Sequence, residues 1–211
     1  MQKKVEPLEA ANIVSIFSTP VYRCNFSRAF TRAEMDFIQK QHEACRPNLG
    51  NKSTKDSYIL NRKIFRSIKK ELELRLQDYL DKVLCATPGI CSYITQSWIN
   101  YTSKGEYHHE HSHANSYISG VLYLTANKNC DQIAFIRKSY FPLVPQPQVF
   151  NDWNSEMWWM PVHTATLILF PSSLAHSVGL KKDDDLRISL SFNTFLKGKL
   201  GAEYKLTELE L

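Results

Sequence analysis

The sequence lacks the features that mark secreted, membrane-spanning or nucleic-acid-binding proteins. Its five cysteines are scattered without a CxxC pair, so neither a disulfide framework nor a zinc-thiolate site is predicted. No apolar run is long enough to span a membrane, and the N-terminus has no signal-peptide core. The net charge of +5 is small, and the basic cluster at 62–70 is interpreted as a solvated helix face.

We therefore expect a cytoplasmic protein with no nucleic-acid signal and no membrane segment. The oligomeric state is not indicated by the sequence.

What the sequence does contain is a helical first half and a β-rich second half. Thr31 and Glu34 have the spacing of a helix capping box, and a longer amphipathic helix is predicted over 61–84. An edge or entry strand is predicted over 13–22, and residues 46–57 are polar and turn-rich. From residue 91 onward, short β-branched and aromatic segments predict strands over 92–101, 117–125, 132–138, 162–171 and 186–196. The fold class is therefore mainly β with N-terminal helices, in a jelly-roll or barrel core.

The chain is predicted to form one domain, residues 1–211. Residues 1–90 supply an N-terminal strand and a helical buttress, residues 91–197 form the β core, and residues 198–211 are a tail. A long proline-containing loop begins at Phe141, and loops of that length are usually functional or mobile. With Trp153, Trp158 and Trp159, it is either a lid over the barrel mouth or a packed flap.

Five of the seven histidines gather in the segment 108–113 or directly after an apolar strand. His111 and His113 are two residues apart, so on a strand both imidazoles project from one face and can reach the same metal ion. His176 follows the apolar segment 167–171 and is the best third ligand. His42 and His163 lie outside this pattern and are interpreted as structural.

Arg187 and Ser189 follow His176 after an acidic turn at 183–185. If the chain reverses there, both side chains lie on one strand face near His176. A guanidinium binds a planar carboxylate through two parallel hydrogen bonds, and a hydroxyl adds a third donor. The combination predicts a metal site with a bound diacid.

Each element has a plainer interpretation when it is taken separately. An HxH pair can be a surface histidine cluster, and His176 can be a hydrogen-bonded core histidine. Arg187 can be an ion-pair partner of Asp184 or Asp185. The prediction of a metal site with a bound diacid depends on the order and spacing in which these residues occur together.

These motifs resemble a family of 2-oxoglutarate/iron(II) oxygenases, many of whose members are encoded by phages. The segment from His111 to Leu124 is similar to the family's H-x-H…S-G-V-x-Y motif. The segment 165–176 resembles G-x-L-x-L-F-P-S-x-L-x-H, with Ala165 where glycine is usual, and 187–193 matches R-x-S-x-S-F-N. The opening segment 16–22 also resembles the family, so the resemblance spans about residues 13–197.

The resemblance implies a double-stranded β-helix that binds Fe(II) and 2-oxoglutarate. It implies that His111, His113 and His176 hold the metal and that Arg187 and Ser189 bind the distal carboxylate of 2-oxoglutarate. Tyr123 would contact the same carboxylate, and Asn193 and Asn100 would line the pocket. The implied reaction uses molecular oxygen to hydroxylate a substrate that the sequence does not identify, with release of succinate and carbon dioxide. If the chain is phage-encoded, its compartment is the host cytoplasm.

One position departs from the wider superfamily, in which the middle ligand is a carboxylate. Here the middle ligand is His113, a neutral donor, and an alternative register through His108 and Glu110 would restore the carboxylate. The block beside Ser116 and Gly120 favours His111 and His113.

Three other functions stay open on the sequence. One is a cupin-like metal-binding protein without catalysis, and another is a three-histidine dioxygenase that does not use 2-oxoglutarate. The third is a structural protein whose histidines bind metal adventitiously. Arg187 discriminates against the second of these, because a dioxygenase that does not use a ketoacid has no need of a buried carboxylate clamp.

Overall fold

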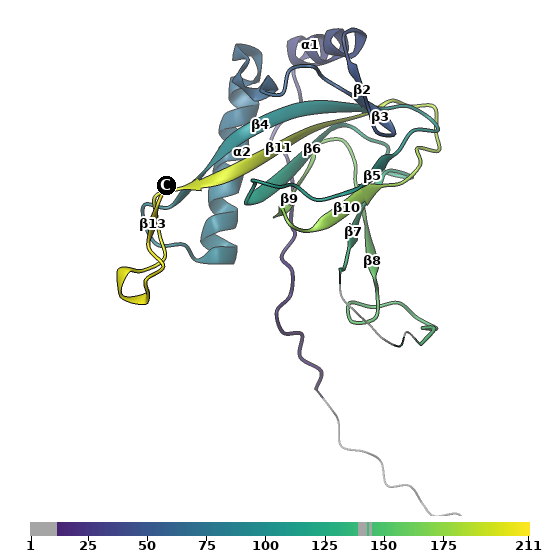
Figure 1. The fold of residues 1–211 in the computed structure, drawn as a ribbon. Coiled ribbons are helices and arrows are strands. Elements are labelled where there is room, and N and C mark those ends of the chain that lie inside the picture. Colours follow the sequence, from purple (N-terminus) through teal and green to yellow (C-terminus); the bar gives the residue numbers. More distant parts are fainter. Residues whose placement is uncertain (1–11, 139–142, 144) are drawn as a thin grey trace, which may run out of the picture.

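The computed structural model describes residues 12–138, 143 and 145–211. Two antiparallel sheets face each other, and two helices cover the outer face of the larger sheet (Figure 1). No helix among the described residues is both long and apolar enough to cross a membrane.

The larger sheet has seven strands in the order β1-β9-β6-β11-β4-β3-β2. Their bounds are β1 Tyr22–Asn25, β2 Arg46–Asn48, β3 Asn51–Ser53, β4 Cys91–Thr102, β6 Ile118–Thr125, β9 Thr166–Pro171 and β11 Arg187–Lys197. β11 lies at the centre, paired antiparallel with β4 on one side and β6 on the other. The C-terminal motif strand is thereby fixed between two strands that are distant from it in sequence.

The smaller sheet has four strands in the order β5-β10-β7-β8. Their bounds are β5 His108–His111, β7 Gln132–Ile136, β8 Met157–Pro161 and β10 Ala175–Val178. β5 and β8 are its edges. Consecutive core strands alternate between the two sheets in several places, as the expected double-stranded β-helix requires.

The helices are α1, Arg32–Glu43, and α2, Arg66–Tyr79, which a π-helical segment η3, Leu80–Leu84, extends. The predicted capping box is present: Thr31 accepts from the Glu34 backbone, and the Glu34 carboxylate accepts from the Thr31 backbone. Short 3-10 turns, η1 Ile59–Asn61, η2 Lys63–Phe65 and η4 Glu203–Lys205, complete the helical structure. The predicted helix over 61–84 therefore begins later as an α-helix.

Period-two alternation on the strands separates two apolar layers. Leu167 and Leu169 of β9 face the helices, while Ile168 and Phe170 face the smaller sheet. Leu72 and Leu76 of α2 are completely buried in the outer layer. The larger sheet therefore has a helix-covered outer face and an inner face that looks into the space between the sheets.

Three local predictions were wrong. The segment 13–19 is irregular, and the first strand comes later, at Tyr22–Asn25, where β9 provides a partner. The turn-rich segment 46–57 contributes β2 and β3, which extend the larger sheet beside β4. Trp158 and Trp159 belong to the edge strand β8 and not to the preceding loop. β1, β3 and β8 pair with strands that are far away in sequence, so local propensity did not reveal them.

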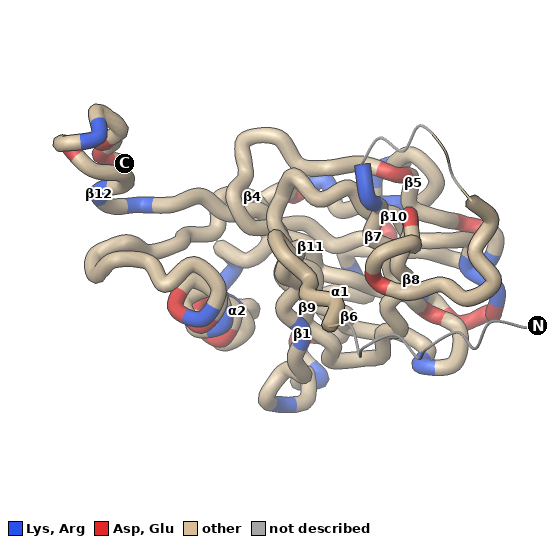
Figure 2. Tube along the Cα trace, turned by 90° about the horizontal axis from the view of Figure 1, so that it is seen from below, with Lys and Arg blue, Asp and Glu red and all other residues tan. Residues whose placement is uncertain are grey.

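The C-terminal residues form a small hairpin of β12, Lys199–Leu200, and β13, Leu209–Glu210. Figure 2 shows basic and acidic residues side by side on α2, and most of the basic residues in the cluster at 62–70 are exposed. Arg62 in that cluster pairs with Asp56. This arrangement agrees with a solvated helix face.

Candidate metal and carboxylate site

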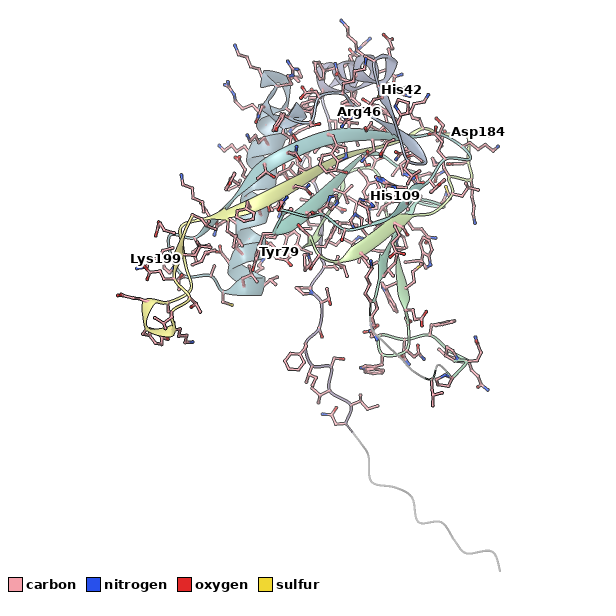
Figure 3. All side chains as sticks on the ribbon, viewed as in Figure 1. His42, Arg46, Tyr79, His109, Asp184 and Lys199 are labelled. Atoms are coloured by element: carbon pink, nitrogen blue, oxygen red, sulfur yellow. The ribbon has the colours of Figure 1, made fainter. Side chains whose placement is uncertain are left out.

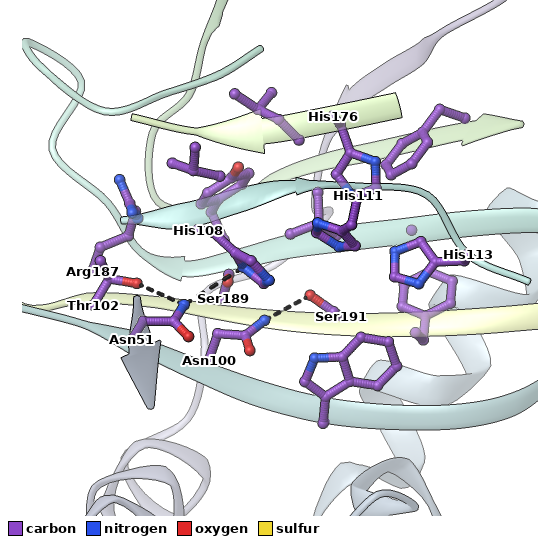
Figure 4. Close-up of a pocket in the computed structure, with 18 residues that line it drawn as sticks. Asn51, Asn100, Thr102, His108, His111, His113, His176, Arg187, Ser189 and Ser191 are labelled. Atoms are coloured by element: carbon purple, nitrogen blue, oxygen red, sulfur yellow. Dashed lines mark hydrogen bonds between the residues drawn. The ribbon is translucent and has the colours of Figure 1, made fainter. Parts of the chain in front are cut away.

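The candidate site lies between the two sheets, and both sheets contribute to its walls (Figure 4). The smaller sheet supplies His108, His111 and His176, and the larger sheet supplies Arg187 and Ser189. All these side chains line a single pocket. Residues that were grouped by sequence motif are therefore also grouped in space.

His111, His113 and His176 converge on one point. Their candidate ligand atoms all lie within 4.8 Å of one another. His111 and His176 are direct partners in the pairing of β5 with β10, and their ring centroids are 4.3 Å apart. The strand β5 ends at His111, and His113 is held in place because its backbone N–H donates to the Ser172 carbonyl, at 2.9 Å.

Backbone carbonyls orient two of these imidazoles. The Nδ1 atom of His111 lies 2.9 Å from the His109 carbonyl oxygen, and Nδ1 of His176 lies 3.0 Å from that of Leu174. A carbonyl only accepts, so each Nδ1 carries the proton and each Nε2 keeps its lone pair. This is the orientation that metal-binding histidines ordinarily have.

The histidines are also held neutral. Burial, with a smaller contribution from the neighbouring His111, lowers the pKa of His176 to about 3 and that of His113 to about 4. Burial lowers the pKa of His111 as well, against the opposing effect of its bond to the His109 carbonyl. Only a neutral imidazole can donate a lone pair to a metal ion, so all three are available as ligands at neutral pH.

Glu110, the alternative carboxylate ligand, points elsewhere. Its carboxylate is 3.4 Å from Lys138 Nζ at the surface, and its side chain is about half exposed. It belongs to neither of the histidine groups whose atoms converge. Of the two predicted registers, the geometry favours the one through His111 and His113.

Arg187 is buried at the polar end of the pocket, where its Nη1 donates to Asp131 at 3.1 Å. Asp131 is itself 3 % exposed and also lies 3.4 Å from Lys181 Nζ. The plainer interpretation named Asp184 or Asp185 as the partner of Arg187, but Asp184 pairs with Lys104 instead. Asp131 is the one hydrogen-bond partner of the Arg187 guanidinium within the described part of the chain, and Arg187 also lines the pocket.

Ser189 and Tyr123 line the pocket next to Arg187, and their backbones pair directly across β11 and β6. Burial raises the pKa of Tyr123, and the nearby Arg187 partly offsets this effect. Tyr123 therefore stays protonated and can donate a hydrogen bond. With Arg187, these two hydroxyls form a cationic, donor-rich end opposite the histidines.

Asn193 does not line this pocket. The Ser119 hydroxyl donates to its Oδ1 at 2.9 Å, and Ser119 bonds in turn to Ser172. A bulge follows Asn193 in its pairing with β4. Asn193 is thus engaged in a buried hydroxyl network beside the pocket.

Several lining residues were missed by the sequence reasoning. Trp98 and Thr102 lie on the same face of β4 as Asn100, which the resemblance had placed in the pocket, so the period-two pattern could have indicated them; Asn51 joins them from β3. Asn100 Nδ2 donates to Ser191 at 3.0 Å, while its buried Oδ1 has no partner. Asp131, which holds the lining residue Arg187, gave no such signal because its charged partners Lys181 and Arg187 are 50 and 56 residues away.

The remaining residues of interest lie outside the pocket lining. His42 stacks on Tyr101, and His163 bonds through Nδ1 to the Thr164 carbonyl, which agrees with structural roles. Trp153, Trp158 and Trp159 are exposed. Residues 141, 142 and 144 of the predicted lid lie outside the described part of the chain.

Residues 96–193 match the model of a protein family described as "Putative 2OG-Fe(II) oxygenase". The family resemblance of the motifs is confirmed. The matched residues run from β4 to β11 and contain every histidine and the arginine of the candidate site. None of the curated proteins matches the chain by sequence.

Solved structures of 2OG-Fe(II) oxygenases share this fold. A 2OG-Fe(II) oxygenase family oxidoreductase from Burkholderia pseudomallei superposes with a TM-score of 0.55 at 16% identity, covering 82% of this chain and 83% of that one. HygX from Streptomyces hygroscopicus, with nickel and 2-oxoglutarate bound, gives 0.56 at 12%, covering 83% and 82%. A Pseudomonas putida prolyl-4-hydroxylase gives 0.54 at 12%, covering 83% and 93%. The fold is therefore the double-stranded β-helix that the motifs predicted.

Proposed function

We propose that this protein is a 2-oxoglutarate- and Fe(II)-dependent oxygenase that hydroxylates a substrate still to be identified. In the overall reaction, a substrate C–H bond, 2-oxoglutarate and O2 give the hydroxylated substrate, succinate and carbon dioxide. The observation that carries the proposal is the placement of three converging imidazoles and a buried arginine in one pocket between the sheets. The proposed cofactors are Fe(II) and 2-oxoglutarate. One structure of HygX has 2-oxoglutarate bound together with nickel.

The donor set fits a divalent transition metal. We assign His111, His113 and His176 as the ligands, because imidazole nitrogen suits iron and their lone pairs are free. When bound, the metal supplies the activation of oxygen and the chelation of the ketoacid. Three neutral ligands leave one more positive charge on the site than two histidines and a carboxylate would. We therefore expect weaker retention of iron than in a carboxylate-containing triad.

The opposite end of the pocket fits the distal carboxylate of the ketoacid. Arg187 supplies the positive charge, and the hydroxyls of Ser189 and Tyr123 supply further donors. Asp131 holds Arg187 from the far side, and Lys181 balances the charge of Asp131. Charge-assisted hydrogen bonds from a buried guanidinium are among the strongest that a protein can offer a carboxylate.

Arg187 also separates the proposal from its rivals. A metal-binding jelly roll without catalysis, or a three-histidine dioxygenase without a ketoacid, has no need of a buried cation facing the metal site. Burying the charge of Arg187 costs free energy unless an anion, either a protein carboxylate or a bound ligand, compensates it. Asp131 compensates part of the charge, so the decision rests on measured binding of 2-oxoglutarate.

The test is an anaerobic titration of the protein with Fe(II) and then 2-oxoglutarate. The chelated complex gives a weak visible charge-transfer band, and we expect this band in the wild-type protein and not in His176→Ala. His163→Ala is the matched control, because His163 also bonds to a backbone carbonyl but lies outside the pocket. An absent band in the wild type, or an undiminished band in His176→Ala, would remove the proposed metal site.

The carboxylate assignment has its own variant. Arg187→Lys keeps a positive charge but loses the two-pronged geometry, so we expect the half-saturating concentration of 2-oxoglutarate to rise at least about tenfold. Succinate release should fall in parallel. Unchanged affinity would separate Arg187 from the ketoacid and favour a purely structural pair with Asp131.

A further inference from the structure

Two histidines beside the proposed metal site have no part in the proposed function. His108 and His109 precede the ligand His111 on β5, the edge strand of the smaller sheet. The candidate ligand atoms of His108, His109 and His111 also lie within 4.8 Å of one another. Five imidazoles thus form two overlapping groups that share His111.

The second group is as closely packed as the first. The rings of His108 and His111 are stacked with centroids 4.6 Å apart, and those of His109 and His111 are 4.9 Å apart. His109 lies on β5 (Figure 3), and its Nδ1 is 3.4 Å from the Leu49 carbonyl. Like His111, His109 is therefore oriented with its Nε2 lone pair free.

His108 is the inner member of this group and lines the pocket. Its Nδ1 is 3.5 Å from the Asn51 amide, which is at the upper limit for a hydrogen bond. That amide is equally far from the Thr102 hydroxyl, so it makes no strong bond to either. The His108 ring is thus free to bind a metal.

The two groups cannot be filled at once. Nδ1 of His111 is committed to the His109 carbonyl, which leaves a single nitrogen, Nε2, for a metal. An imidazole nitrogen has one lone pair and binds one ion. A metal on His108, His109 and His111 therefore excludes a metal on His111, His113 and His176.

We infer that His108, His109 and His111 form a second, outer position for the divalent metal, which exchanges with the inner position through the shared His111. The inner position rests on the proposed function, whereas the outer position rests only on the histidine geometry. His109 is on the edge strand, so an arriving ion reaches the outer group first. His111 then passes the ion inward to the buried His176.

The experiment is an anaerobic titration with Co(II), whose visible absorption reports its ligands. The variant His113→Ala/His176→Ala lacks the inner group and should still bind one Co(II) per chain, with affinity reduced about 10- to 100-fold. Its spectrum should differ from that of the wild type. His111→Ala lacks the shared ligand and should lose both positions.

The complementary variant is His108→Ala/His109→Ala, which lacks the outer group. At saturation we expect the spectrum of the wild-type complex, since the inner ligands are intact. In stopped-flow mixing, loading should slow on the order of tenfold, because the ion is no longer concentrated next to His111. His163→Ala is the control and should load at the wild-type rate.

Two results would overturn the inference. One is the absence of Co(II) binding by folded His113→Ala/His176→Ala, with His113→Asn/His176→Gln as the replacement if the alanine pair does not fold. The other is two Co(II) ions per wild-type chain, which would contradict the shared ligand. A failure of the proposed function gives a different result. The wild type would then show no charge-transfer band with Fe(II) and 2-oxoglutarate, whatever the Co(II) titrations show.

Discussion

The two faces of the larger sheet are built from the same strands but carry opposite chemistry. On β11, Ile188 and Leu190 point into the apolar layer under the helices, while Arg187, Ser189 and Ser191 point into the pocket. Successive side chains of a strand alternate between its faces, so one segment contributes to both layers. We infer that the outer face contributes most of the stability, whereas the inner face contains buried polar groups that build the pocket.

The largest expected effect comes from removing the Asp131 carboxylate, which compensates the buried positive charges behind the inner face. Asp131→Ala leaves Arg187 and Lys181 buried without their shared carboxylate. We expect a loss of about 3–5 kcal/mol in the free energy of unfolding, measured by urea denaturation. Lys104→Ala, which breaks an exposed pair with Asp184, is the control and should cost less than about 1 kcal/mol. A small loss in Asp131→Ala would mean that the inner polar network is not a structural unit.

Neighbouring residues of β11 allow a direct comparison of the two faces. Leu190→Ala deletes a completely buried side chain under the helices and should cost about 2–5 kcal/mol. Ser191→Ala removes only a hydroxyl that accepts from Asn100, and should cost about 1 kcal/mol. Thermal and urea unfolding of both variants give the measurement. Equal losses in the free energy of unfolding would contradict the inference that the outer face contributes more to stability than the inner face.

The pH dependence of stability should come from the inner face. The pKa values of His108 and His176 are lowered from 6.5 to about 3, and that of His113 to about 4, chiefly by burial. Between these values and 6.5 the unfolded chain takes up protons that the folded chain does not, so stability falls as the pH falls. We expect the free energy of unfolding of the metal-free protein to decrease from about pH 6.5 to pH 4.

The variant His113→Asn/His176→Asn lacks two of these groups and should show a shallower dependence over the same range. Urea midpoints measured at several pH values provide the comparison. A wild-type midpoint that stays constant down to pH 4 would show that these histidines are solvated in solution.

The smallest effect concerns the helices that cover the outer face. Thr31→Ala removes the side chain that caps α1 and should cost about 1 kcal/mol, with no change in 2-oxoglutarate affinity. Thr31→Ser retains the hydroxyl and is the control. A change in ligand affinity would mean that the outer layer is coupled to the pocket.

Local sequence signals predicted much of this molecule. The capping box, the apolar spacing of α2 and the β-branched and aromatic composition of β4, β6, β9 and β11 are local signals, and the structure confirms these elements. Ala165, which stands where the family usually has glycine, has φ +71°, a region that favours glycine. The glycine of the family motif therefore corresponds to a position with positive φ, which the motif alone did not reveal.

What the sequence by itself determined is the content of the site: the histidines, Arg187 and Ser189, and the strands that carry them. Only the tertiary structure decided how they meet. The pairing of His111 with His176 and the link from Asp131 to Arg187 both join distant segments. The same holds for β1 to β3, whose place depends on β9 and β4. The physical reason is that a strand or a buried charge is stable only with its partner, and local propensity carries no information about where that partner lies.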